Sequence, residues 1–376
     1  MMASILLAAA LAALAAHLAT IGLYLARRRG PGGNLGLPAV TLLRPVCGRD
    51  SYDAETLGSS FGQDYPDYEI IFCAPSDHDP AVALVRALIA AHPGTRARLL
   101  VGDNAITGNP KLNNLLKGWK AAAHDWVCMT DSNLLLPADY LRTVVGTWEA
   151  DTGLVSSPPV GTRPAGFASH LECAFLNGNQ ARLQVASDSL GFGFAQGKTL
   201  FWNRRMLDRA GGPPALGRRL AEDVGATRLV RAMGLRVRLT PRPFAQPIGP
   251  RTFRQVWDRQ LRWSRVRRDG FPLLFAAEIA NGAALPTAAL ALAGVMLALP
   301  AAVLGGSVAA FLALWYGAEA LLARHAGWPA GPADIAAMPV RDLLLPLLWA
   351  ATFGARGIAW RGTAMAPPAF GEERVR

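Results

Sequence analysis

Cysteine is scarce in this chain, which has only four in 376 residues: Cys47, Cys73, Cys128 and Cys173. They are widely separated, form no Cys-x-x-Cys pair and lie in apolar runs. A disulfide framework or a zinc site needs paired or closely spaced cysteines, so we expect these four to be reduced residues of the core. Histidine is also rare, and neither His78 nor His124 has a companion at metal-site spacing.

The features that accompany ATP or nucleic-acid binding are absent too. Gly197-Lys198-Thr199 resembles part of a phosphate-binding loop, but the glycine that would complete it at the required spacing is missing. The net charge is +11, yet the arginines are not interleaved with aromatic residues as in RNA-binding modules. Seven of them precede the last apolar stretches, which favours a surface facing anionic lipid headgroups. They are Arg251, Arg254, Arg259, Arg262, Arg265, Arg267 and Arg268.

What the chain does have is apolar stretches of membrane length. From Ala3 to Ala26 the only strongly polar side chain is His17, and a helix of this length crosses a bilayer core. A cleaved signal peptide carries its positive charge before the apolar core, whereas Arg27-Arg28-Arg29 follow it, so we expect an uncleaved anchor. Because basic residues next to a span tend to stay in the cytoplasm, the N-terminus is expected outside and residues 31–278 inside.

A second apolar region occupies the last quarter of the chain. Gly282–Pro300 and Val303–Leu322 are candidate spans, and Leu343–Trp360 is a shorter third one, interrupted by Pro346 and Arg356. Two spans would return the C-terminus to the cytoplasm and three would place it outside, and both possibilities stay open. The expected organisation is an anchor (1–30), a cytosolic domain (31–278) ending in an interfacial segment (about 251–275), and a C-terminal membrane region (279–376).

The polar segment alternates strand-like and helix-like runs. Strands are expected at 39–43, 68–73, 98–101 and 126–130, with helices at 80–92 and 111–123 between them. Farther on we expect an edge strand at 199–202, a helix at 222–233 ending at Gly234, and a strand at 235–239. This alternation predicts an α/β fold with a mostly parallel sheet, whose ligands bind beyond the carboxyl ends of the strands.

One candidate binding site, Asp131-Ser132-Asn133, directly follows a predicted strand. Asp131 and Asn133 place oxygen-bearing side chains at i and i+2, which suits a divalent cation bridging the phosphates of a nucleotide. Asn133 offers a carbonyl oxygen rather than a carboxylate, so we expect weak metal binding without nucleotide. The same triplet is also common in ordinary turns and helix caps.

A second strand end carries Asp77-His78-Asp79, followed by Pro80. Either carboxylate is a candidate for holding the base or ribose of a nucleotide, and Asp79-Pro80 is also a strong helix N-cap signal. Both interpretations hold if Asp79 caps and Asp77 binds. Lys111, at the start of a predicted helix after Asn109-Pro110, is a candidate contact for a nucleotide phosphate or a solvated lysine.

The remaining polar motifs suit group transfer. Asp223, in Glu222-Asp223 at a helix start, either complements the helix dipole or removes the proton of an acceptor hydroxyl attacking a sugar's anomeric carbon. A direct displacement of this kind inverts the anomeric configuration. Arg259, Arg262 and Trp263 either offer planar cations and an aromatic face to a departing diphosphate or form a basic interfacial helix.

In this order the segments resemble the membrane ceramide glucosyltransferases, specifically their bacterial members, a branch of the inverting GT-A glycosyltransferases. The resemblance runs from the N-terminal anchor to about Leu274 and more loosely through the C-terminal spans. It rests on Leu42-Leu-Arg-Pro45 with Gly48 and Asp50, Gln63-Asp-Tyr-Pro66, Asp77-His-Asp-Pro80, Asn109-Pro-Lys-Leu-Asn-Asn114, Asp131-Ser-Asn133, Ala221-Glu-Asp223 and Arg259-Gln-Leu-Arg-Trp263.

The resemblance implies a GT-A domain, a UDP-sugar donor such as UDP-glucose, Mg²⁺ or Mn²⁺ as cofactor, and ceramide as lipid acceptor. It further implies that the site near Asp79 holds nucleotide, that the Asp131 motif binds metal and diphosphate, and that Asp223 is the base. Arg259, Arg262 and Trp263 match the family's Arg-x-x-Arg-Trp signature. The implied location is a bacterial inner membrane, with several spans and the catalytic domain facing the cytoplasm.

One departure from the family concerns the acceptor side. Animal members carry a His-Pro-Arg segment before the third acidic site, where this chain has Gln180-Ala181-Arg182, so a histidine contact is not carried over. A hopanoid or diacylglycerol glycosyltransferase would use the same catalytic parts. A processive polysaccharide synthase is disfavoured because few spans are available to build a channel, and a non-catalytic membrane scaffold is the alternative of a different class.

Overall fold

The computed structural model describes residues 1–27, 33, 35–102, 105–218, 221–354, 358–360 and 363–365. The chain divides into two compact units, each built from separate segments. The first, which we call the helical unit, contains residues 1–27, 160–186 and 248–356. The second, the sheet unit, contains residues 28–159, 187–247 and 357–376.

The sheet unit is organised around a seven-stranded sheet in the order β3-β2-β1-β4-β7-β5-β8. The strands are β1 (Val40–Pro45), β2 (Tyr68–Ala74), β3 (Ala97–Val101), β4 (Trp126–Thr130), β5 (Thr152–Ser156), β7 (Thr199–Asn203) and β8 (Arg236–Leu239). The pairs β1–β2, β1–β4, β2–β3 and β5–β8 are parallel, whereas β7 is antiparallel to β4 and β5. The predicted mostly parallel sheet is confirmed.

The described residues of the sheet unit contain eight helices, of which three match the expected ranges 80–92, 111–123 and 222–233. The eight are α2 (Asp53–Gly58), η1 (Ser59–Phe61), α3 (Pro80–Ala91), α4 (Pro110–Ala121), α5 (Tyr140–Val145), α8 (Arg204–Arg209), α9 (Gly212–Leu216) and α10 (Glu222–Ala232). Asp79 caps α3 by accepting from Ala81 N at 2.9 Å, and Asn109 caps α4 in the same way. Gly234, with φ of +71°, follows α10, because a left-handed residue there favours glycine. A strand pair, β10 (Ile358–Trp360) and β11 (Thr363–Met365), completes the unit.

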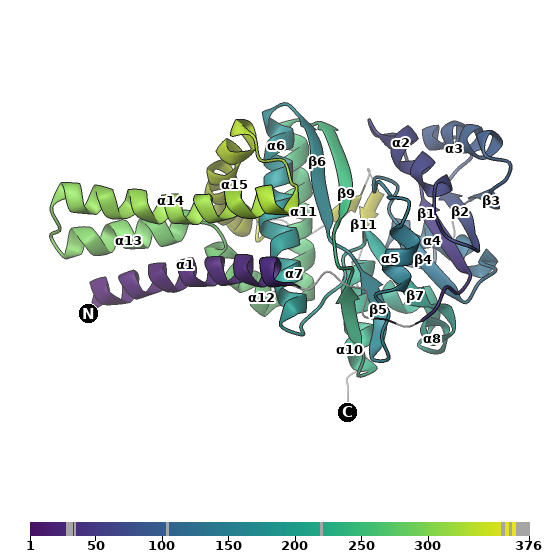
Figure 1. Ribbon diagram of the computed structural model, residues 1–376, viewed down its shortest axis with the longest axis horizontal. Helices are drawn as coiled ribbons and strands as arrows, with labels where there is room; N and C mark the ends of the chain where they lie inside the picture. Colours follow the sequence, from purple (N-terminus) through teal and green to yellow (C-terminus); the bar gives the residue numbers. More distant parts are fainter. Residues whose placement is uncertain are drawn as a thin grey trace. The chain divides into compact units, whose positions relative to one another are not determined.

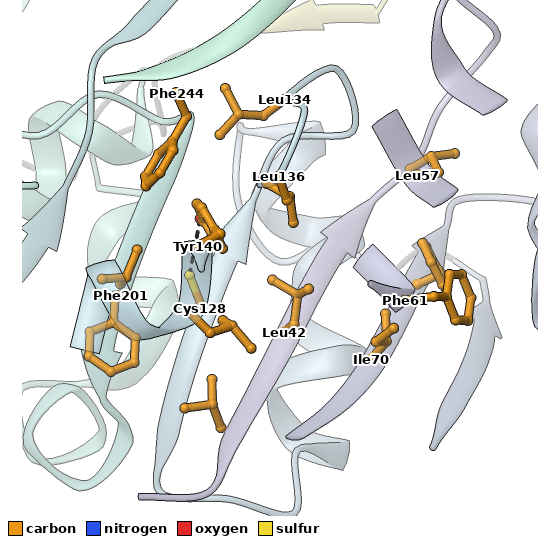
Figure 2. Packing of buried hydrophobic residues seen from close by; sticks show 14 of the residues in the cluster. Leu42, Leu57, Phe61, Ile70, Cys128, Leu134, Leu136, Tyr140, Phe201 and Phe244 are labelled. Atoms are coloured by element: carbon orange, nitrogen blue, oxygen red, sulfur yellow. Dashed lines mark hydrogen bonds between the residues drawn. The ribbon is translucent and has the colours of Figure 1, made fainter. Parts of the chain in front are cut away.

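One face of the sheet is closed by an apolar core (Figure 2). Leu42 of β1 and Ile70 of β2 are fully buried and belong to one cluster with Leu57 of α2 and Phe61 of η1. Tyr140 of α5 also lies in this cluster, where its hydroxyl group is 3.4 Å from the Cys128 sulfur. All six residues of β1 are buried, so both faces of the strand are covered, as expected for a central parallel strand.

The strand at 199–202 was predicted at the edge of the sheet, and this prediction is wrong. The observed β7 lies inside the sheet, between β4 and β5. Its register with β4 pairs Thr199 with Thr130, so the amino end of β7 meets the carboxyl end of β4. This antiparallel insertion decides which side chains face Asp131.

The helical unit consists of long helices and one further strand pair. Its elements are α1 (Met2–Ala26), α6 (Phe167–Ala174), the π-helix η2 (Phe175–Ala181), α11 (Phe253–Gly270), α12 (Pro272–Ala277), η3 (Glu278–Ala280), α13 (Ala284–Met296), α14 (Ala301–Ala326) and α15 (Pro332–Ala351). Three more elements belong to it only in part: β6 (Pro159–Ala165), α7 (Arg182–Ser189) and β9 (Phe244–Pro250). Strands β6 and β9 pair with each other. Helices α1, α13 and α14 lie side by side (Figure 1).

Two of these helices, α1 and α14, are long and apolar enough to cross a membrane. A third span results if α12 and η3 count together with α13, although this pair is bent by 53°. Within the expected span at Gly282–Pro300, α13 covers only Ala284–Met296. The third expected stretch, Leu343–Trp360, lies partly in α15, which begins at Pro332. Arg28 and Arg29, which we used to orient the anchor, lie outside the described residues.

All four cysteines lie in the described part of the chain, and none of them is paired in a disulfide. Cys73, Cys128 and Cys173 are buried, while Cys47 is partly exposed. Burial raises the pKa of the Cys73 thiol to about 11, which keeps it protonated at neutral pH. The expected position in the core is thus confirmed for three of the four.

Candidate active site

The loops that follow β1, β2 and β4 leave the sheet at one edge. Their strands are parallel, and the register pairs Pro45 with Cys73 and Leu43 with Met129, so the three carboxyl ends lie close together. The Asp77–Asp79 turn follows β2, and Asp131 follows β4. Both acidic sites predicted at strand ends are therefore on the edge where parallel sheets bind ligands.

At this edge, four charged side chains from four parts of the sequence form what we call the lysine–carboxylate cluster: Lys111, Asp131, Lys198 and Glu222. Asp131 accepts from Lys111 at 2.6 Å through Oδ1 and from Lys198 at 3.0 Å through Oδ2. Lys198 Nζ also lies 3.0 Å from Asn133 Oδ1. Both predicted metal ligands thus contact one lysine that precedes β7.

Lys111 lies at the centre of the cluster. Its ammonium group donates to Asp131, to Glu222 Oε1 at 2.6 Å, and to the carbonyl oxygen of Gly197 at 2.6 Å. Burial alone would lower the pKa of Lys111, but the two carboxylates outweigh it and raise this pKa above its usual range. Lys111 is therefore a fixed positive charge.

Asp131 shows the complementary effect. Burial alone would raise the pKa of its carboxyl group, but Lys111 and Lys198 outweigh it and hold this pKa well below its usual range. Its side chain keeps 22% of its exposure, so the charged carboxylate remains reachable from solvent.

The position of Glu222 is fixed from two sides. Its Oε2 accepts from the buried side chain of Asn109 at 2.8 Å, which links α10 to the cap of α4. A Cβ atom at residue 197 would lie 2.6 Å from Glu222 Oε1 and 3.0 Å from Lys111 Nζ. A side chain at position 197 would therefore have to displace the ion pair between Lys111 and Glu222.

Asp223, the predicted base, borders this cluster. Its carboxylate accepts from Gly197 N at 3.0 Å and from Val224 N at 2.8 Å. Burial is the main cause that raises the pKa of Asp223 to about 6, and the negative charge of Glu222 is the second. Lys111 and the two backbone amides oppose this shift. Such a carboxylate is still mainly ionised at pH 7 and is more basic than a surface aspartate.

The two aspartates after β2 have different surroundings. The Asp79 carboxylate caps α3 and also accepts from Gly48 N at 2.9 and 3.0 Å, which ties the loop after β1 to the loop after β2. Asp77 is exposed and pairs with Arg86 at 2.7 Å. The predicted cap at Asp79 is present. The Asp79 carboxylate accepts backbone hydrogen bonds that hold α3 and the loop after β1, whereas the Asp77 carboxylate only pairs with a side chain at the surface.

Arg44, at the end of β1, supports the loop that carries Asp131. Its side chain is fully buried, and one guanidinium nitrogen donates to the carbonyl oxygens of Ser132 at 3.1 Å and Leu134 at 3.2 Å. These bonds hold the backbone on both sides of Asn133.

The remaining predicted residues belong to the helical unit, on α11. Arg259 donates to Glu172 of α6 at 2.8 Å, and the Glu172 side chain is only 1% exposed. Trp263 packs against a small buried cluster that includes Leu176 and Ile248. Arg262 lies one turn from Arg259 and is partly buried.

The segment that departs from the family pattern lies in and after the π-helix. Gln180 donates to Gln260 of α11 at 3.2 Å. Arg182 donates to Thr20 at 2.6 Å and contacts His17 Nδ1 at 3.0 Å, both on α1. His17, the one strongly polar residue of the first span, is therefore buried against a charged partner.

The donor set at Asp131 suits a metal that is shared with a ligand. Asp131 and Asn133 offer hard oxygen atoms, the type that Mg²⁺ and Mn²⁺ prefer. Among the described residues, no group of three or more His, Cys, Asp or Glu side chains forms a cage for a metal by itself. The residues thus fit a cation held jointly by the protein and a diphosphate.

Sequence reasoning did not single out Lys198, Asn109 or Arg44 for the site. Lys198 was noted only as part of a rejected phosphate loop, because nothing local in its sequence shows that its strand is inserted next to β4. Asn109 and Arg44 carry no functional signal of their own. The Leu-Leu-Arg-Pro and Asn-Pro-Lys segments that contain them were quoted only for the resemblance.

Comparison with known proteins agrees with this architecture. Among solved structures, the mannosyltransferase PcManGT from Pyrobaculum calidifontis, in complex with GDP-Man and Mn²⁺, matches with a TM-score of 0.54 and 23% identity over 90% of this chain and 99% of that chain. At this identity the likeness supports the fold alone, and the predicted GT-A fold is confirmed.

Relatives by sequence include two ceramide glucosyltransferases. Ceramide glucosyltransferase 1 of Caenorhabditis elegans is 28% identical over 244 residues, 64% of this chain and 52% of that protein. Ceramide glucosyltransferase of Komagataella phaffii is 43% identical over 99 residues, 25% of this chain and 19% of that protein. The chain spans about half the length of the nematode relative. A model of glycosyl transferase family 21 matches residues 4–367. The chain therefore belongs to glycosyl transferase family 21.

Proposed function

We propose that this chain transfers a hexose, glucose first among the candidates, from a UDP-sugar to ceramide with inversion at the anomeric carbon. The two ceramide glucosyltransferases above support the acceptor. The observation that carries the chemistry is Asp223, a carboxylate with its pKa raised to about 6 at the border of the lysine–carboxylate cluster. A base beside a site suited to a diphosphate is what sugar transfer from a nucleotide requires.

Each residue at the sheet edge has a proposed task. Asp223 accepts the proton of the acceptor hydroxyl, and Lys111 balances the charge of the diphosphate. Asp131 and Asn133 hold Mg²⁺ or Mn²⁺, which when bound neutralises negative charge on the departing diphosphate. Asp77, whose carboxylate is not used as a cap, is the better candidate for the nucleotide of the two aspartates after β2.

The proposal extends to the helical unit and to the membrane. We assign contact with the departing diphosphate and the sugar to Arg259, Arg262 and Trp263. Measurement of UDP binding to the Arg262→Met variant tests this assignment. Helices α1 and α14 are proposed to anchor the enzyme in a bacterial inner membrane, with residues 31–278 in the cytoplasm. The acceptor would then be a lipid of the same membrane.

The test is a transfer assay with the purified full chain in detergent, with Mg²⁺ or Mn²⁺, a panel of UDP-sugars, and ceramide, diacylglycerol and hopanoid acceptors. Products are identified by mass. We expect a hexosylceramide that forms with one UDP-sugar. Transfer only to diacylglycerol or hopanoid would overturn the acceptor and keep the chemistry, whereas no transfer to any lipid would favour the scaffold.

A further inference from the structure

Lys198 occupies the place that a divalent metal is expected to take. Its ammonium group contacts Asp131 Oδ2 and Asn133 Oδ1, both at 3.0 Å, and these are the two predicted metal ligands. The side chain is 12% exposed, so it is held inside the cluster. The contact follows from the fold, since β7 is antiparallel to β4 and Asp131 N donates to the Lys198 carbonyl oxygen at 3.2 Å.

We propose that Lys198 is a built-in cation at the metal site, and that a divalent cation carried by a nucleoside diphosphate must displace its ammonium group from Asp131 and Asn133. This inference rests on the proposed function, because it takes the donor to be a nucleoside diphosphate sugar. It adds to that function a residue that controls when the metal binds.

The ammonium group and a divalent cation exclude each other at this place. Both would bind Oδ2 of Asp131 and Oδ1 of Asn133. Two positive charges a few ångströms apart repel each other strongly where solvent is limited. A lysine side chain can give way, because its charge is carried on a flexible four-carbon stem. A diphosphate arriving with the metal offers the displaced ammonium group a new anionic partner.

Lys111 is not the cation that leaves. Its three N–H groups have three acceptors, Asp131, Glu222 and the Gly197 carbonyl oxygen, each at 2.6 Å. If it moved away, it would leave Glu222 buried with only Asn109 as a neutral donor. Lys198 contacts the carboxylate of Asp131, whose charge a bound metal would balance in its place, and the neutral amide of Asn133.

The consequence is that metal and nucleotide bind together. Without nucleotide, the metal competes with Lys198, and the displaced ammonium group has no diphosphate to bind. With nucleotide, the displaced charge is balanced by the diphosphate. Lys198 therefore couples the two ligands, and by linkage the coupling must be equal in both directions.

The experiment measures Mn²⁺ binding to the full chain in detergent, from the signal of free Mn²⁺ in paramagnetic resonance, with and without UDP. In the absence of UDP we expect Lys198→Met to bind Mn²⁺ more tightly than the unmodified protein, on the order of 10-fold, because a charged competitor is removed. Addition of UDP should then strengthen Mn²⁺ binding less in Lys198→Met than in the unmodified protein. Lys198→Arg keeps the charge and should not gain affinity.

Two further variants secure the result. Lys198→Gln removes the charge but keeps a hydrogen-bonding side chain, and it replaces Lys198→Met if that variant does not fold. Lys120→Met changes an exposed lysine on α4 and should leave Mn²⁺ binding unchanged. Melting curves show whether the two neutral variants are folded. If both are folded and neither binds Mn²⁺ more tightly than the unmodified protein, the proposal is overturned. Absence of Mn²⁺ binding to every variant would also overturn it.

These titrations contain neither sugar nor lipid, so they separate this inference from the proposed function. If no lipid product forms but neutral variants gain Mn²⁺ affinity, the transfer reaction is wrong and the role of Lys198 stands. If lipid product forms and Mn²⁺ affinity does not change, the role of Lys198 is wrong and the reaction stands.

Discussion

The two units each contain a cluster of buried charges, and the clusters differ in their access to solvent. In the sheet unit, the side chains of the lysine–carboxylate cluster keep between 9% and 22% of their exposure. In the helical unit, Arg341 pairs with Glu319 and Asp342, and these side chains keep only 1% to 2%. We call this second group the arginine–carboxylate cluster.

Closely packed glycines stand beside both clusters. Gly197 leaves room for Lys111 and Glu222 in the sheet unit, and a Cβ atom at Gly178 would overlap the Glu319 carboxylate in the helical unit. Arg341 also donates to the carbonyl oxygen of Ala174, just before the π-helix. The same kind of ion pairing therefore joins elements in both units, and what differs is whether another ion can reach it.

This difference separates a structural ion cluster from a functional one. Glu319 lies on α14, a helix long enough to cross a membrane, where an unpaired charge is very costly. The arginine–carboxylate cluster is buried from solvent, so we assign it a structural role, which is to join α14 to α15. The lysine–carboxylate cluster is open enough for its partners to exchange, which a site for a charged substrate requires.

Breaking the sealed cluster should have the largest effect. Arg341→Met leaves Glu319 and Asp342 without their cation and should destabilise the protein by about 3–5 kcal/mol, seen as a large fall in the melting temperature in detergent. The triple variant Glu319→Gln, Arg341→Met, Asp342→Asn removes all three charges and should recover most of this loss. A melting temperature unchanged in Arg341→Met would refute the structural assignment.

At the open site, Asp223→Asn should change catalysis rather than folding. We expect turnover to fall on the order of 100-fold or more, because the amide cannot accept the acceptor's proton, while UDP-sugar binding is kept. Asp125→Asn, a change at an exposed aspartate paired with Arg205, is the matched control and should leave turnover unchanged. Full turnover in Asp223→Asn would end the base assignment.

Asp131→Ala should act on binding. Without this carboxylate, Mn²⁺ should no longer strengthen UDP binding, and we expect the affinity for UDP in the presence of Mn²⁺ to fall at least about 10-fold. Calorimetric titration of UDP at increasing Mn²⁺ concentration measures this. If the metal dependence is the same as in the unmodified protein, the metal lies elsewhere.

The smallest expected effect is that of pH. The folded-state pKa of Asp223 is raised to about 6, so the ionised form that can act as a base predominates above pH 6 and is lost as the pH falls below it. Turnover should therefore be about half-maximal near pH 6 and about 10-fold lower at pH 5. Turnover that stays constant down to pH 5, with saturating donor, would contradict the assignment.

Many local features of the chain could be predicted from its sequence. The cap at Asp79, the apolar strands before Asp77 and Asp131, and the long apolar helix at the N-terminus are all present as expected. These features depend on a few neighbouring residues or on simple periodicity, because capping, strand burial and span length are short-range properties. The mostly parallel sheet followed from the alternation of these elements.

The sequence could not predict which distant side chains would meet. Lys198 contacts Asp131 because β7 is inserted antiparallel between β4 and β5, and Arg182, the first residue of α7, contacts His17 of the first apolar helix. The register of strands far apart in sequence, and the contacts between distant helices, depend on the packing of the whole unit. By itself the sequence therefore determined the elements and the candidate chemistry, whereas only the tertiary structure decided that one lysine lies where the metal is expected.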